Sequence, residues 1–253
     1  MRINNNIMAM NAHNQLRVNN YRQGKSIEKL SSGFRINRAA DDAAGLAISE
    51  KMRGQIRGLS QAQRNAQDGV SLVQTAEGAL NEVSDMLIRM KELFVQKANG
   101  TYSTADGSNI DKELTALRQE ITNIANNTKF NGKVLLKGAN FTIQIDDSSA
   151  NLITPSVQLS GLGTADLAAV ETAIGTIAAE RADLGAIQNR LEHTVNNLGT
   201  TVENLQASES RIRDTDMAKE MMNFTKFNIL QQASQSMLAQ ANMAPQGVLQ
   251  LLG

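Results

Sequence analysis

The sequence contains no cysteine and no tryptophan, and only two of its 253 residues are proline. Without cysteine the chain can form neither a disulfide bond nor a thiolate metal site. Its aromatic residues are six phenylalanines and two tyrosines, so it lacks the side chains that usually fill a compact globular core. Pro155 and Pro245 leave residues 1–154 and 156–244 free of the residue that most strongly interrupts a helix. The composition therefore predicts long helices that bury narrow apolar stripes.

The sequence also lacks an excess of charge of either sign, because 25 lysines and arginines balance 25 aspartates and glutamates. A neutral chain has no electrostatic attraction for nucleic acid or for anionic lipid, so we expect neither partner. No run of 18 apolar residues is present, so we expect no membrane insertion. The first residues have no apolar segment of the kind that a cleaved signal peptide requires, so we expect no such leader.

Apolar residues at helical spacing predict a mostly α fold, a long antiparallel helical bundle or coiled-coil rod. Residues 43–98 form the longest expected helix, and residues 109–127 and 164–207 form two more. The stripe in the first of these alternates spacings of three and four, as helices packed side by side require. Its members are Val73, Ala76, Leu80, Val83, Leu87, Met90 and Phe94, flanked by Leu72, Ala79, Met86 and Leu93. The loop expected at 99–108 is short enough to make the helices on either side antiparallel neighbours.

Residues 130–163 are the one region where we expect β structure. Asn131-Gly132 is a strong turn dipeptide, and Phe141, Ile143 and Ile145 alternate with polar residues as in a strand. Three regions result. They are an N-terminal helix within 1–36 that ends at Gly33, a helical rod at 37–207, and a C-terminal helix within 208–253 that we expect Pro245 to stop.

The two ends of the chain share an unusual composition. Residues 3–16 and 227–253 contain no aspartate, glutamate, lysine or arginine, and sparse apolar residues are separated by asparagine, glutamine and serine. One interpretation is a pair of frayed, solvated termini. The other is a surface buried among copies of the chain, because charged residues are depleted from the centres of interfaces. The second predicts a self-assembly core made of Ile3, Ile7, Met10, Leu16, Phe224, Phe227, Leu230, Met237, Leu238, Leu251 and Leu252.

Several segments closely resemble the terminal signatures of bacterial flagellin. In the first half these are KLSSGFRIN at 29–37, DDAAGLAI at 41–48, NAQDG at 65–69 and QTAEGALN at 74–81. In the second half they are QNRLEH at 188–193, ESRIRD at 209–214, DMAKE at 216–220, AQAN at 239–242 and QLL at 250–252. The resemblance covers about 1–135 and 165–253 and leaves no room for a large variable outer domain.

The resemblance implies a structural subunit that self-assembles into the flagellar filament and serves swimming motility. Its terminal helices would form an inner coiled coil, and residues 37–207 would form an outer rod. It implies secretion through the flagellar type III pathway to the extracellular filament. The implied partners are copies of the chain, a filament cap, a junction protein and an export chaperone at the C-terminal helix.

The resemblance also implies a host partner. Residues 89–96 are similar to the stretch that the flagellin-sensing Toll-like receptor binds on monomers, with contacts at the positions of Arg89, Leu93 and Glu120. Arg89 and Leu93 are four residues apart, on one face of a helix. They lie beside the apolar stripe, so they could face outward. In the other interpretation, Leu93 belongs to the flanking stripe and packs within the bundle. Lys91 and Phe94 depart from the residues often found at these positions.

No pattern in the sequence points to catalysis, a cofactor or a metal site. His13 and His193 lie far apart, and no HExxH, phosphate-loop or dinucleotide motif is present. Asp41 and Asp42 are expected to cap a helix, since carboxylates are favourable at a helix N-terminus. Four nearby cations are expected to form salt bridges, at Arg35, Arg38, Arg53 and Arg57. The chain is therefore not expected to be an enzyme.

Two other functions remain open. The hook–filament junction protein has similar terminal helices, although its signatures match this chain less well. A cytoplasmic coiled-coil adaptor would also be rich in long helices. Growth of filaments from seeds would separate a filament subunit from a junction protein, and release into the culture medium would exclude an adaptor.

Overall fold

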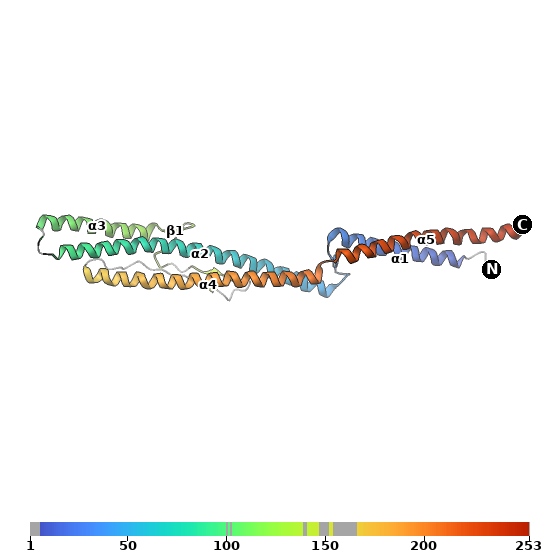
Figure 1. Ribbon diagram of the computed structural model, residues 1–253, viewed down its shortest axis with the longest axis horizontal. Coiled ribbons are helices and arrows are strands. Elements are labelled where there is room, and N and C mark those ends of the chain that lie inside the picture. The colour runs from blue at the N-terminus through green and yellow to red at the C-terminus, as the bar shows by residue number, and fades with distance from the viewer. Residues whose placement is uncertain are drawn as a thin grey trace. The chain divides into compact units, whose positions relative to one another are not determined.

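The computed structural model describes residues 6–99, 101, 103–138, 141–146, 152–153 and 166–252, and for 152–153 and 244–252 it describes the backbone alone. The chain forms two compact units, residues 1–54 with 205–253 and residues 55–204. Helices dominate both units (Figure 1). The elements are α1 (Ile7–Ser32), α2 (Ala43–Lys97), α3 (Thr104–Asn127), β1 (Lys129–Phe130), β2 (Lys133–Val134), β3 (Ile143–Gln144), β4 (Leu152–Ile153), α4 (Leu167–Arg213) and α5 (Met217–Leu252).

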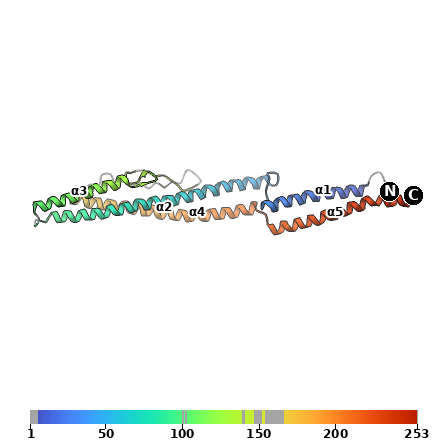
Figure 2. The same ribbon diagram turned by 90° about the horizontal axis from the view of Figure 1, so that it is seen from above.

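The unit at 55–204 is a bundle in which α3 and α4 lie alongside α2, as both views show (Figures 1 and 2). Ion pairs between the helices show the direction in which each one runs. Lys97 binds Asp111 across the α2–α3 turn, while Lys91 of α2 binds Glu171 near the start of α4. Arg181, which interrupts the apolar spacing of α4, lies 3.8 Å from Glu77 of α2. Both neighbours therefore run antiparallel to α2, as the sequence predicts.

The predicted apolar stripe is the core of this bundle. Val73, Leu80, Val83, Leu87 and Met90 are completely buried. The core extends to one residue in every seven along α4, because a heptad spacing keeps one face of a helix against its neighbour. These α4 residues are Val170, Ile177, Leu184, Leu191 and Leu198. The burial pattern thus confirms the heptad interpretation.

Among the described residues, the β region contains two antiparallel strand pairs, and β3 lies against α2. β1 and β2 pair across the two-residue loop Asn131-Gly132, whose φ angles of 47° and 80° are those of a type I′ turn. β3 pairs antiparallel with β4. Ile143 and Ile145 are buried, while the intervening Gln144 is only half-buried, so the predicted alternation is confirmed. Much of the expected β region, including 154–163, lies outside the described residues.

In the other unit, α1 and α5 run antiparallel side by side (Figure 2). Asn6 caps the start of α1 by accepting a hydrogen bond from the Ala9 amide. α1 ends where predicted, at Gly33, which has the left-handed φ of 75°. Asp42 caps α2 by accepting the Gly45 amide at 2.8 Å. Asp41 instead accepts from Lys25 at 2.7 Å and from the Arg38 amide at 3.1 Å.

Three helix boundaries differ from the expected ones. α3 begins at Thr104 and not at 109, because Ser103 and Asp106 form a capping box. α4 continues to Arg213 and not to 207, and the next helix starts after Asp216 accepts the Lys219 amide. The expectation that Pro245 stops the last helix is wrong, because α5 runs through it to Leu252.

No helix in the described part of the chain has the length and hydropathy needed to cross a bilayer.

Candidate functional site

Apolar side chains are distributed very unequally between the two units. Of the 25 buried hydrophobic residues described, 24 belong to the unit at 55–204, and Ile36 is the exception. Of the 17 large hydrophobic residues described as exposed, 15 belong to the other unit. A monomer rarely exposes so many apolar side chains in one region unless that region binds something. The unit formed by α1 and α5 is therefore the candidate interaction surface.

The predicted self-assembly residues lie on this unit with a range of exposures. Ile7 is 60% exposed, Met10 62% and Met237 64%. Contacts within the chain therefore leave most of the surface of these three side chains open to solvent. Leu230 is 38% exposed. Leu16, Phe224, Phe227 and Leu238 are half-buried between the helices. Ile3 and the side chains of Leu251 and Leu252 lie outside the described residues.

An apolar groove runs between α1 and α5. It encloses a volume of about 490 Å³ and is lined from α1 by Met8 and Ala12 and from α5 by Leu230, Ala233 and Met237. The remaining lining residues are Asn11, Gln15, Ser234, Gln240 and Ala241, so no charged side chain borders it. An uncharged groove of this kind suits an apolar side chain from another protein surface, because no ion has to be desolvated.

The segment that joins α1 to α2 contacts the segment that joins α4 to α5, and the sequence did not predict these contacts. Phe34 and Asp214 form an antiparallel β-bridge, and the Thr215 amide donates to the Gly33 carbonyl at 2.9 Å. The Arg213 guanidinium lies 4.8 Å from the Phe34 ring centroid and binds Glu50 at 2.9 Å. The Arg213 hydrogen bond, followed by the nearby charge of Arg53, lowers the pKa of Glu50. These pairings link residues far apart in the chain, so no local pattern could predict them.

The three residues assigned to receptor binding have different surroundings. Arg89 is exposed and binds Glu92 and Glu113, both at 3.0 Å, and these carboxylates raise its pKa. Glu120 is exposed and accepts a hydrogen bond from Asn123. Leu93 is only 1% exposed and belongs to the bundle core, so of its two interpretations the structure supports the one in which it packs within the bundle. Helices pack on two sides of α2, so the flanking Leu72 is also buried, while Ala79 and Met86 are half-buried.

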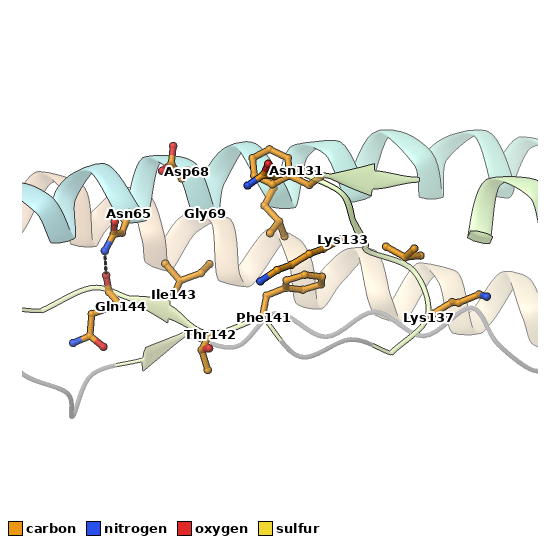
Figure 3. Close-up of a pocket in the computed structure, with 13 residues that line it drawn as sticks. Asn65, Asp68, Gly69, Asn131, Lys133, Lys137, Phe141, Thr142, Ile143 and Gln144 are labelled. Atoms are coloured by element: carbon orange, nitrogen blue, oxygen red, sulfur yellow. Dashed lines mark hydrogen bonds between the residues drawn. The ribbon is translucent and has the colours of Figure 1, made fainter. Parts of the chain in front are cut away.

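A pocket of about 750 Å³ lies between α2 and residues 130–144, with Lys133 and Lys137 among its lining residues (Figure 3). The NAQDG motif at 65–69 borders this pocket and contacts strand β3. The Asn65 amide donates to the Gln144 carbonyl at 3.1 Å. A Cβ atom at Gly69 would come within 2.7 Å of Ile143 Cδ1, so glycine allows the strand to approach the helix. This part of the resemblance therefore has a structural role.

The groups considered for catalysis are engaged in other ways. His13 and His193 are exposed on different helices, α1 and α4. Asp41 and Asp42 make the separate contacts given above and do not act as a carboxylate pair. Three of the four nearby arginines lie in ion pairs, as expected: Arg35 with Asp42, Arg38 with Glu28 and Arg53 with Glu50. Within the described ranges, no three metal-ligating side chains converge.

Comparisons with known proteins agree with the sequence motifs. The model of the bacterial flagellin N-terminal helical region matches residues 3–141, and that of the C-terminal helical region matches 167–252. The flagellin of Bacillus subtilis (strain 168) is 50% identical, and that of Halalkalibacterium halodurans is 53% identical, each alignment covering both chains completely. The flagellar filament 31.3 kDa core protein of Treponema maltophilum is 45% identical, again over both full lengths.

These names favour a filament subunit over a junction protein or an adaptor. They also describe structural proteins and not enzymes. The long antiparallel helices, the buried heptad stripe and the exposed apolar terminal unit are consistent with that role. The chain belongs to the bacterial flagellin family and is a structural component of the flagellar filament.

Proposed function

We propose that the chain polymerises through the exposed apolar side chains of α1 and α5 and that the resulting filament serves swimming motility. The observation that carries this proposal is the distribution of burial, with 15 of the 17 exposed large hydrophobic residues on the terminal unit. Each such side chain gains roughly 1.5–3 kcal/mol when it is fully buried. Neighbouring copies can provide that burial.

The composition of the terminal helices supports a partner of the same kind. Residues 6–16 and 227–252 carry no ionisable group other than His13, so identical surfaces can approach without burying like charges. Amide and hydroxyl side chains can satisfy one another across such an interface. Identical subunits that meet through unlike surfaces form open helical polymers unless a ring closes.

Filament growth from seeds tests the assembly surface. Purified protein lacking residues 239–253 should remain helical but fail to elongate filament fragments. The single substitution Met237→Glu should have the same effect, because it places a charge on a side chain that is 64% exposed in the monomer. Thr101→Glu, in the exposed α2–α3 loop, is the matched control and should elongate normally. Normal growth of the Met237→Glu protein would contradict the assignment.

The membership of the flagellin family supports a route and a set of partners for assembly. We infer export by the flagellar type III pathway, an export chaperone that binds the C-terminal helix, and contacts with the filament cap and the junction protein. Comparison of the culture medium with whole cells tests export. Loss of chaperone binding after removal of residues 239–253, with an unchanged rod, tests the helix assignment. Retention of the intact protein inside motile cells would contradict the route.

We further propose that the host flagellin-sensing Toll-like receptor binds the monomer on the exposed faces of α2 and α3. The exposure of Arg89 and Glu120 supports direct contacts, while buried Leu93 would act by holding α2 in place. Arg89→Asp monomers should activate receptor-expressing reporter cells far less than wild type. Lys129→Asp, which alters an exposed residue beyond α3, is the control. An unchanged response to Arg89→Asp would exclude the assigned contact.

A further inference from the structure

The uncharged ends of the chain contain a single ionisable side chain, and it is the histidine His13. Residues 3–16 and 227–253 otherwise hold only apolar, amide, hydroxyl, glycine and proline residues. A neutral imidazole offers one hydrogen-bond donor and one acceptor, as the surrounding amides do, whereas the imidazolium offers two donors, no acceptor and a positive charge. An unperturbed histidine side chain has a pKa of about 6.5, so this change of character falls between pH 5 and 8.

His13 lies on the surface that we assign to assembly. On α1 it shares one helix face with Met10, three residues before it, and with Tyr21 further along. Met10 is 62% exposed and Tyr21 is 66% exposed, and His13 is exposed as well. The segment of α5 that pairs with this part of α1, from Leu230 to Ala241, carries no charge. A neighbouring copy that covers Met10 therefore also approaches His13.

No carboxylate side chain lies near His13 to balance a positive charge. The sequence has no aspartate or glutamate in residues 1–27, nor in 221–253. The nearest ionisable side chains on either side of His13 in the sequence are Arg2 and Arg17, which are both cations. Arg17 lies four residues away on the same helix face, where like charges repel. Because copies of the chain present the same carboxylate-free helices, assembly through these ends does not supply a counter-ion.

We propose that His13 makes assembly sensitive to pH, because the neutral imidazole is compatible with the interface between copies and the imidazolium opposes its formation. This proposal rests on the proposed polymerisation through α1 and α5. It does not require the two helices to be paired before assembly, since an unassembled His13 is hydrated in either case. The free chain then binds the proton more readily than the filament does. Assembly therefore strengthens as pH rises and weakens as pH falls through the range in which histidine titrates.

Seeded growth of the full-length protein at about pH 7.5 and about pH 5.5 tests the proposal. The concentration of free protein left when growth stops should be about tenfold higher at the lower pH, because each subunit must release one proton to join the filament. His13→Gln keeps a donor and an acceptor but cannot gain a proton, so the same concentration should change by less than about twofold. His13→Lys is charged at both pH values and should assemble poorly at both.

His193→Gln is the matched control, because it removes the other histidine, which lies on α4 in the rod unit. It should keep the full pH dependence of wild type. Equal responses of His13→Gln and wild type, or wild-type growth that is the same at both pH values, would overturn the role of His13. Normal growth of His13→Lys near pH 7.5 would overturn it as well. These results would leave the assembly surface intact, whereas normal growth of Met237→Glu would remove the surface on which the His13 proposal rests.

Discussion

The bundle core makes a sharp prediction about two adjacent residues of α2. Leu87 is completely buried, whereas Ile88 is 47% exposed on the same turn. Replacing buried leucine by alanine removes its transfer free energy and leaves a cavity, at a total cost of about 3 kcal/mol. Ile88→Ala removes a similar number of atoms from a partly solvated site, where substitutions usually change stability by about 0.5 kcal/mol. Alanine is the best helix former, so neither change weakens the helix itself.

Thermal unfolding followed by circular dichroism measures the difference. For a unit of about 150 residues, 1 kcal/mol shifts the melting temperature by roughly 2–4 °C, so Leu87→Ala should lower it by about 6–12 °C. Ile88→Ala should change it by about 2 °C or less. Denaturant unfolding should give the same order, with an unchanged slope because the surface exposed on unfolding is nearly the same. Equal losses for the two variants would refute the view that the heptad stripe carries the stability of this unit.

Two further outcomes follow from local contacts. Ser103→Ala should destabilise α3 by about 1 kcal/mol, because it removes the capping box with Asp106, while Thr101→Ala in the same loop should be nearly neutral in the same unfolding assay. The hydrogen bond from Lys25 and then the Arg38 amide lower the pKa of Asp41. Asp41 therefore stabilises the connector fully above its ordinary pKa of about 4, and the contribution disappears as pH falls through the lowered value. The free energy of unfolding should therefore be higher for wild type than for Asp41→Asn at neutral pH, and this difference should disappear as the solution is acidified through that range. A difference in unfolding free energy that stays constant at all pH values would contradict the assignment.

Periodic and local features of the fold could be predicted from the sequence. The alternating spacing around Leu87 located the core because each buried residue lies on one face of a long helix. Gly33 and the Asn131-Gly132 turn were recognisable because each requires a left-handed backbone that few other residues adopt. The charge-free ends indicated the candidate interaction surface, because charge is costly to bury and its absence is visible without any structure.

Features that depend on distant partners could not be predicted in the same way. The orientation of Leu93, outward or into the bundle, stayed open because a two-position stripe does not reveal that α3 and α4 both cover α2. The bridge between Phe34 and Asp214 joins two connectors separated by most of the chain. Pro245 was expected to end α5, since no local rule indicates that the distant Asn6 side chain donates a hydrogen bond to the Ala241 carbonyl, four residues before the proline.

The pairing of α1 with α5 also governs the order in which the molecule can form. The residues that meet across this pair are separated by more than 200 positions, as in the contact of Asn19 with Ser234. During synthesis α1 emerges first and α5 last, so α1 cannot pair with α5 until the rest of the chain has been made. The α2–α3 hairpin closes over a short loop and has no such delay. The apolar face of α1 therefore stays unpaired in every incomplete chain, and a protein that binds the newly made C-terminal segment can prolong that open state.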